Sequence, residues 1–262
     1  MQAFNYSSPT TIADAARAAN APEARLIAGG QSLLPSMKLG LASPAALVDL
    51  AAIAQLRGIS QQGSAVVVGA MTTHAAVAAS ADVRKAIPAL AALAEGIGDR
   101  QVRNRGTLGG SIANNDPAAD YPAAVLALGA TIQTDRRTIA ADDFFKGLYE
   151  TALKEGEIIV SVSFPVPEKA GWQKFKQPAS RFSLVGVFVA KGPQGVRVAV
   201  TGAGPCVFRA TALESKLSSD WSARACDGVK IDAAGLNSDL HGSGEYRAAL
   251  IPVLAGRAVA GN

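Results

Sequence analysis

The sequence predicts an α+β protein, and three observations carry this prediction. Short apolar runs typical of strands alternate with helical patterns over residues 1–57, and they do so again over 58–169. Pro165-Val166-Pro167 then interrupts the pattern, and two β-rich runs follow it, with helices after them. We therefore divide the chain into three domains, 1–57, 58–169 and 170–262. With 262 residues and 49% hydrophobic content, the chain is long enough to bury more than one core.

The first domain is predicted to be a small β-α-β unit. Ser8-Pro9 provides a cap and a proline at the first helical position, and apolar residues recur at helical spacing to about Asn20. Arg25 to Ala28 and Ala46 to Leu50 are short apolar strands. Leu33 to Leu39, between them, predicts a short helix or an irregular turn, and the two strands are expected to pair in parallel.

The second domain mixes strands and helices. Its strand patterns cover Ala65 to Gly69, Thr131 to Thr134 and Glu157 to Phe164. Helices are predicted from Thr73, over a longer stretch with one apolar face from Ile87 to Ile97, and again after Pro122.

The third domain begins with two β-rich runs, Leu184 to Ala190 and Val196 to Thr201. Lys191 to Gly195 between them has the composition of a hairpin loop. Helices follow near Ala212 and from Ser243 onward.

Composition excludes several classes of protein. The net charge is +4, but Lys and Arg are scattered without a run or stripe, which disfavours a nucleic-acid-binding surface. The N-terminus has no secretory pattern and no stretch is apolar enough to span a membrane, so we expect a cytoplasmic protein. Two cysteines, Cys206 and Cys226, are too few for an iron-sulfur cluster or a structural zinc and are expected to be reduced.

The two histidines give no sign of a catalytic triad. His74 stands where a helix is predicted to begin, and His241 lies beside Gly242 in a predicted loop. Neither has a nucleophile in a recognisable setting, so no catalytic residue is assigned to this chain.

The first motif with chemical meaning is a glycine pair after a strand, in Ile27-Ala28-Gly29-Gly30-Gln31-Ser32. Glycines without Cβ can adopt positive φ and turn successive N–H groups toward an anion, and the Ser32 hydroxyl adds a donor. This chemistry suits a phosphate or pyrophosphate. Taken by itself, the pair is better explained by a tight turn without a ligand, and the pattern is neither a Rossmann fingerprint nor a P-loop.

A second glycine-rich segment, Asn104 to Ser111, precedes Asp116-Pro117-Ala118-Ala119-Asp120. Its three glycines and interleaved hydroxyls predict another anion cradle. Asp120 could cap the next helix or accept hydrogen bonds from cofactor hydroxyls.

Together these motifs resemble those of the FAD-binding medium subunit of the xanthine dehydrogenase and carbon monoxide dehydrogenase family of molybdenum hydroxylases. A third match, Lys174 to Arg181, is similar to the segment that opens the family's C-terminal flavoprotein domain. Phe182 and Ser183 depart from the acidic-aromatic pair common in relatives. The matches span nearly the whole chain in the family's order.

The resemblance implies a two-subdomain FAD-binding fold of the vanillyl-alcohol-oxidase (PCMH) type and a C-terminal α+β domain with a three-stranded antiparallel sheet. It implies that FAD is bound noncovalently, with residues Ile27, Ala28, Gly29, Gly30, Gln31 and Ser32 at the pyrophosphate and Thr107, Gly110 and Ser111 on the second face. Asp120 would bind a cofactor hydroxyl and Ile159 would contact the flavin ring. Lys176 would lie close to the ring and stabilise the anionic reduced flavin, unless it is a solvated surface lysine.

The resemblance also implies partners. Molybdopterin would reside on a large subunit and [2Fe-2S] clusters on a small subunit, in a heterotrimer or its dimer. Electrons would pass from the clusters through FAD to an external acceptor, without turnover of the organic substrate on this chain. Two alternatives are a self-contained flavin reductase or oxidase of the same fold and a nonenzymatic nucleotide-binding scaffold.

Overall fold

The N-terminal part of the chain forms a small parallel sheet, as predicted. The computed structural model describes residues 2–261. The strands are β1 (Asn5–Ser7), β2 (Ala24–Ile27) and β3 (Ala46–Asp49), in the order β1-β3-β2, and β3 pairs in parallel with both neighbours. β1 was not predicted, because its three residues are all exposed and lack the alternation of a half-buried strand.

Two helices accompany this sheet, α1 (Ile12–Ala19) and α2 (Leu33–Lys38). The predicted start of the first helix at Ser8-Pro9 is wrong. The N-cap is Thr11, whose hydroxyl accepts a hydrogen bond from the amide of Asp14 and satisfies a donor at the helix start.

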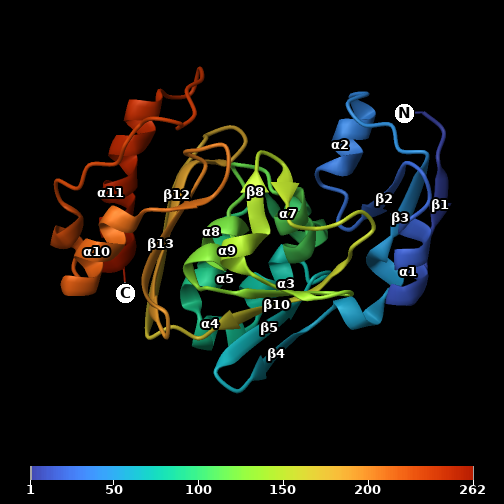
Figure 1. Ribbon diagram of the computed structural model, residues 1–262, viewed down its shortest axis with the longest axis horizontal. Helices are drawn as coiled ribbons and strands as arrows, with labels where there is room; N and C mark the ends of the chain where they lie inside the picture. Colours follow the sequence, from blue (N-terminus) through green and yellow to red (C-terminus); the bar gives the residue numbers. More distant parts are fainter. Residues whose placement is uncertain (1, 262) are drawn as a thin grey trace.

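The central part is built on a five-stranded antiparallel sheet in the order β4-β5-β10-β6-β7. Its strands are β4 (Ile59–Gln62), β5 (Ala65–Gly69), β6 (Thr131–Thr134), β7 (Thr138–Ala140) and β10 (Ile159–Pro165). A two-stranded ribbon of β8 (Phe145–Gly147) and β9 (Glu150–Thr151) lies apart from it in Figure 1.

Short helices pack against this sheet and supply most of the largest hydrophobic core. They are α3 (His74–Ala79), α4 (Ala81–Ala86), α5 (Pro88–Glu95), α6 (Arg100–Arg105), α7 (Leu108–Asn114), α8 (Tyr121–Ala127) and α9 (Ala141–Phe144). Single 3-10 turns occur at Leu50–Ala52, Ala54–Leu56 and Ala223–Cys226. The helix predicted with an apolar face from Ile87 to Ile97 is present as α5, but it begins only at Pro88, because the residue before a proline is sterically kept out of the α conformation.

The C-terminal part contains the predicted antiparallel sheet with one more strand than expected. β11 (Lys169–Lys176), β12 (Ser183–Gly192) and β13 (Gly195–Thr201) are joined by β14 (Phe208–Arg209), a two-residue edge strand beside β13. The predicted hairpin loop is confirmed, since Gly192 pairs with Gly195 across a two-residue turn.

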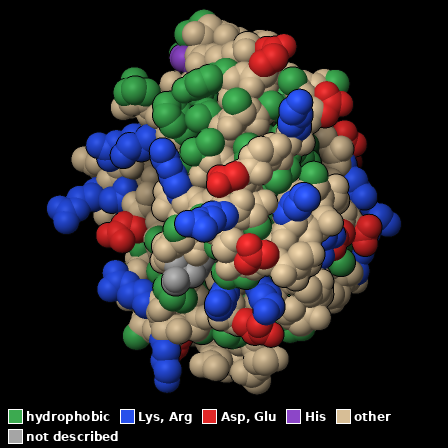
Figure 2. All heavy atoms as spheres, turned by 90° about the vertical axis from the view of Figure 1, so that its left-hand side faces the viewer, with side chains coloured by type: hydrophobic (Ala, Val, Ile, Leu, Met, Phe, Trp, Pro, Cys, Tyr) green, Lys and Arg blue, Asp and Glu red, His purple; other side chains and the backbone are tan. Residues whose placement is uncertain are grey.

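This sheet lies between two layers of helices (Figure 1). One face packs on α5 and α8, and α10 (Thr211–Ser219) and α11 (Gly244–Ala260) cover the other. Figure 2 shows the outer helical face, on which acidic and basic side chains are interspersed and hydrophobic ones gather in the upper part. No helix within residues 2–261 is both long and apolar enough to cross a membrane.

Candidate functional site

The two glycine-rich segments, far apart in sequence, pack directly against each other. A Cβ on Gly29 would overlap the carbonyl of Arg105 and lie 2.8 Å from Cα of Gly106. A Cβ on Gly110 would lie 3.3 Å from Cβ of Ala28. The absence of these side chains allows the β2–α2 loop to reach the start of α7, and the two segments form one candidate site.

The β2–α2 loop has the features expected of an anion-binding turn. The amide N–H groups of residues 29–32 have no hydrogen-bond partner among residues 2–261, and Gly30 has φ +72°. The hydroxyl of Ser32 also has no partner in this part of the chain. Consecutive free donors around a left-handed residue make a concave anion-binding backbone, so this loop fits a phosphate or pyrophosphate.

The second segment leaves fewer hydrogen-bond donors free for an anion than predicted. Thr107 is the N-cap of α7, and its hydroxyl accepts from the amide of Gly110 at 3.2 Å. The amides of Leu108 and Gly109 donate to the carbonyls of Thr72 and Ala70 at 3.1 and 2.8 Å. These donors of the first turn therefore stabilise the fold. The Ser111 side chain, within residues 2–261, keeps a hydroxyl without a partner.

Asp120 is buried between the central and C-terminal parts of the chain. Its Oδ2 accepts from Lys174 Nζ at 2.6 Å, and its Oδ1 accepts from Ser183 Oγ at 2.7 Å. The predicted helix-capping role is wrong, because the Asp120 side chain makes no cap hydrogen bond to α8. Burial raises the pKa of this carboxyl, while Lys174 and Ser183 oppose the rise. Each oxygen retains capacity for one more hydrogen bond from a ligand hydroxyl.

Lys174, like Ser183, is a polar residue of this site that sequence reasoning did not assign. Its side chain is nearly buried against Asp120, with Cε 3.8 Å from the position of a Cβ on Gly96. The side chain of Lys176, two residues further along β11, is exposed and has no hydrogen-bond or ion-pair partner within residues 2–261. The pairing of β11 with β12 shifts register between Phe175 and Lys176, so simple strand alternation does not relate the two lysines.

Ile159 begins β10 and is buried in the largest core cluster, with 5% of its surface exposed. Its side chain therefore packs into this core.

His74 lies at the start of a helix and His241 in a loop, as predicted. His74 begins α3 beneath Gly106, where a Cβ would overlap its ring, and its Nδ1 is buried without a hydrogen-bond partner among residues 2–261. Cys226 is a buried free thiol, and Cys206 is a free thiol of intermediate exposure. No group of three or more His, Cys, Asp or Glu side chains in the described residues could hold a metal ion.

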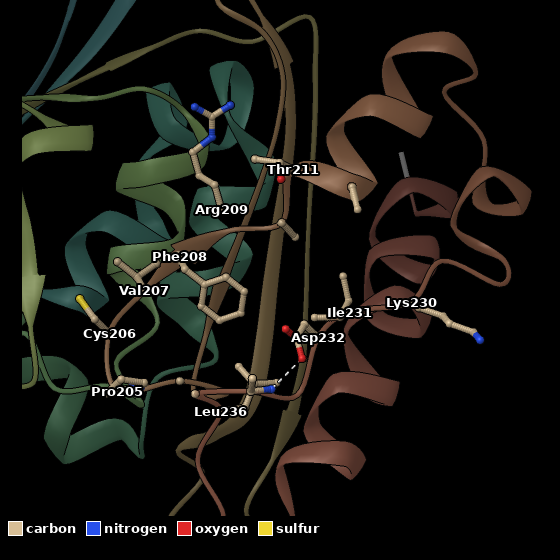
Figure 3. A pocket seen from close by; sticks show the side chains of 15 residues that line it. Pro205, Cys206, Val207, Phe208, Arg209, Thr211, Lys230, Ile231, Asp232 and Leu236 are labelled. Atoms are coloured by element: carbon tan, nitrogen blue, oxygen red, sulfur yellow. Dashed lines mark hydrogen bonds between the residues drawn. The ribbon is translucent and has the colours of Figure 1, made fainter.

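A hollow of about 500 Å³ lies elsewhere, between residues 204–212 and the loop 230–236. Figure 3 shows the Phe208 ring between these two segments, with Ile231 and Leu236 beside it. Asp232 accepts a hydrogen bond from the backbone of Ala234 at 2.9 Å, and Arg209 pairs with Glu214. The hollow includes neither glycine segment.

Residues 2–167 match the family model described as the FAD binding domain in molybdopterin dehydrogenase. The chain belongs to this family. It is 35% identical to the carbon monoxide dehydrogenase medium chain of Hydrogenophaga pseudoflava, covering 98% of this chain and 96% of the relative. It is 37% identical to the nicotine 6-hydroxylase medium subunit of Paenarthrobacter nicotinovorans, covering 99% and 97%.

Solved structures of the family agree with the fold. The structure of the Hydrogenophaga pseudoflava carbon monoxide dehydrogenase that lacks the Mo-pyranopterin moiety superposes with a TM-score of 0.88 at 35% identity, covering 99% of this chain and 96% of that one. Quinoline 2-oxidoreductase from Pseudomonas putida 86 gives 0.87 at 32% identity, covering 99% and 96%. The chain is therefore an FAD-binding component of the oxidoreductase class, with the predicted α+β fold.

Proposed function

We propose that this chain is the electron-transfer subunit of a molybdenum hydroxylase, receiving electrons from [2Fe-2S] clusters on a small subunit and passing them to an external acceptor. Molybdopterin would reside on a large subunit, where the organic substrate reacts. The observation that carries the proposal is the run of free amides at residues 29–32, packed against the start of α7 in a chain of the FAD-binding family. Medium subunits of carbon monoxide dehydrogenase and nicotine 6-hydroxylase are its relatives.

The proposed cofactor site consists of the β2–α2 loop, the residues at the start of α7, and a third group around Asp120. The pyrophosphate would meet the β2–α2 loop, which consists of Ile27, Ala28, Gly29, Gly30, Gln31 and Ser32. Across the site, Gly110 allows close approach, Thr107 holds the start of α7, and Ser111 offers a hydroxyl. Bound FAD supplies a redox centre that exchanges both single electrons and electron pairs.

Asp120, with its remaining lone pairs, would accept a hydrogen bond from a cofactor hydroxyl. The backbone at Ile159 would lie against the flavin ring. Lys174 keeps Asp120 paired, and Lys176, which has no other partner within residues 2–261, would place its charge near the ring.

The three-part division at 57 and 169 is also a proposal for domain boundaries. It is supported by the three main sheets, because the strands of each sheet fall within one part except for Lys169, the first residue of β11. The two FAD-binding subdomains would then comprise residues 1–57 and 58–169, and the C-terminal flavoprotein domain residues 170–262.

Two experiments test the proposal. The purified chain should carry about one FAD per chain, released by acid without covalent attachment; a colourless protein that takes up no FAD would contradict it and support a scaffold. The FAD-loaded chain alone should not oxidise organic substrates. Turnover without partners would favour the self-contained reductase or oxidase.

Assembly is tested separately. Co-expressed with a molybdopterin subunit and a two-cluster iron-sulfur subunit, the chain should coelute with both on size exclusion, as a heterotrimer or its dimer. A chain that stays alone in the presence of both partners would contradict the assignment.

A further inference from the structure

The hollow of about 500 Å³ shown in Figure 3 lies between two stretches of backbone that, within the described chain, form no hydrogen bond with each other. One stretch is β14 with the residues around it, 204–212, and the other is the loop 230–236. Asn237 holds them together at the end of the loop. Its amide donates to the carbonyl of Ala203 at 2.8 Å, and its Nδ2 donates to the carbonyl of Gly204 at 2.9 Å.

The outer edge of β14 is unpaired. Ala210 donates its amide to the carbonyl of Val198 in β13 at 2.8 Å, so the backbone groups of Phe208, two residues earlier, also face β13. Those of Val207 and Arg209 point to the opposite side, because backbone groups alternate along an antiparallel strand. The N–H and C=O of both residues have no partner within residues 2–261, and both residues line the hollow.

The opposite wall of the hollow also has free backbone groups. Residues 230–232 have no regular secondary structure, and their N–H and C=O groups have no partner among the described residues. An extended polypeptide has N–H and C=O groups along both of its edges, and an unpaired sheet edge can accept such a strand. The hollow is therefore a groove in which one added strand could pair on both sides.

The side chains that line the groove are largely apolar. Phe208, Ile231 and Leu236 are half-buried and lie around the hollow in Figure 3. Partly exposed apolar side chains beside a free sheet edge provide contacts for the side chains of an added strand.

The free charge in the groove is negative. Asp232 is exposed, and one of its oxygens accepts from the amide of Ala234 at 2.9 Å. The guanidinium of Arg209 is paired with Glu214 at 2.7 Å, and the Lys230 side chain points away from the hollow in Figure 3. The groove therefore complements a segment that carries a Lys or Arg.

We infer that this groove binds an extended segment of a partner polypeptide, which adds a strand beside β14. The segment would be apolar apart from one Lys or Arg that faces Asp232. Its backbone would pair with Val207 and Arg209 on one side and with residues 230–232 on the other. The groove includes neither glycine segment, so binding should be the same with and without FAD.

The test uses the full chain and a fluorescently labelled peptide, Val-Thr-Val-Arg-Val-Thr-Val, whose β-branched residues favour an extended backbone. Fluorescence anisotropy should show saturable binding. Hydrogen exchange at the amides of Val207 and Arg209 should slow at least tenfold in the complex, because these amides become paired. The same peptide with N-methyl groups at alternate residues lacks donors along one edge and should bind at least tenfold more weakly.

The charge preference is tested with Asp232→Asn. This variant keeps an oxygen for the amide of Ala234 but removes the charge, so it should weaken peptide binding about two- to fivefold. It should also bind equally well a peptide with Glu in place of Arg, which the unmodified chain should bind more weakly. Asp227→Asn is the matched control, because Asp227 is exposed and lies outside the groove, and it should bind both peptides as the unmodified chain does.

Three results would overturn the inference. They are the absence of saturable binding, binding that leaves exchange at Val207 and Arg209 unchanged, and equal weakening by Asp232→Asn and Asp227→Asn. A chain that takes up no FAD but binds the peptide as described would contradict the proposed function alone, so the two failures are distinguishable.

Discussion

Lys174 Nζ lies 2.6 Å from Oδ2 of Asp120, and this buried ion pair links the C-terminal sheet to the start of α8. Ser183 binds the other carboxylate oxygen from the neighbouring strand. The C-terminal sheet therefore contributes directly to the site that the two glycine segments begin. A charge buried at this depth is stable only while its partners remain.

Lys174→Met should destabilise the protein by about 3 kcal/mol, because it leaves the Asp120 carboxylate buried without its cation. Urea unfolding measures the change at neutral pH. Lys176→Met is the matched control, since Lys176 is exposed and without a partner in residues 2–261, and it should alter stability by less than about 0.5 kcal/mol. Equal effects of the two substitutions would show that the Lys174–Asp120 pair does not stabilise the fold.

Gly30→Val should abolish FAD retention while the protein still folds. The side chain would oppose the φ of +72°, lie within 2.8 Å of Leu34 Cδ1, and obstruct the anion's approach. Gly40→Val is the control, because Gly40 has φ +74° with nothing within 4 Å of its Cβ position. FAD per chain, from absorbance, should be near normal in the control. Normal flavin content in Gly30→Val would refute the assignment of this loop.

Lys176→Met should lower the flavin midpoint potential without affecting reduction of molybdenum by substrate in the assembled enzyme. A charge-assisted contact of about 1 to 2 kcal/mol to the reduced flavin corresponds to a fall of roughly 20 to 40 mV for a two-electron couple. Spectroelectrochemistry measures the potential, and rapid mixing follows the molybdenum half-reaction. An unchanged potential would leave Lys176 as a surface lysine.

The stability of the protein should fall as the pH drops from 6.5 to 4, because of His74. Burial, and then the charge of Arg103, lowers the pKa of His74 from 6.5 to about 4. Within this window the unfolded chain binds a proton at His74 that the folded chain does not, so acid favours unfolding. The loss between pH 7.5 and pH 5 should be about 2 kcal/mol from this residue. Glutamine does not titrate, so the free energy of unfolding of His74→Gln, measured with urea, should not show this loss of about 2 kcal/mol between pH 7.5 and pH 5. If the variant and the unmodified protein lose the same stability over this range, His74 is not the cause of the pH dependence.

The sequence was sufficient to predict the turns whose conformation depends only on residues close together in the chain. The glycines after β2 predict the anion-binding turn because only residues without Cβ adopt positive φ freely, and Gly30 does so. The loop between β12 and β13 follows in the same way from its glycines and proline. The family motifs, in order along the chain, identified the fold and the cofactor class.

Tertiary structure decided which groups remain available to a ligand. Leu108 and Gly109 look like cradle donors in the sequence, but carbonyls of Ala70 and Thr72, more than thirty residues earlier in the chain, accept their hydrogen bonds. Asp120 meets Lys174 and Ser183, which are 54 and 63 residues away. Periodicity and turn chemistry report only on neighbours in sequence, whereas the pairing of buried polar groups depends on how sheets and helices pack, and so these partners appear only in the folded chain.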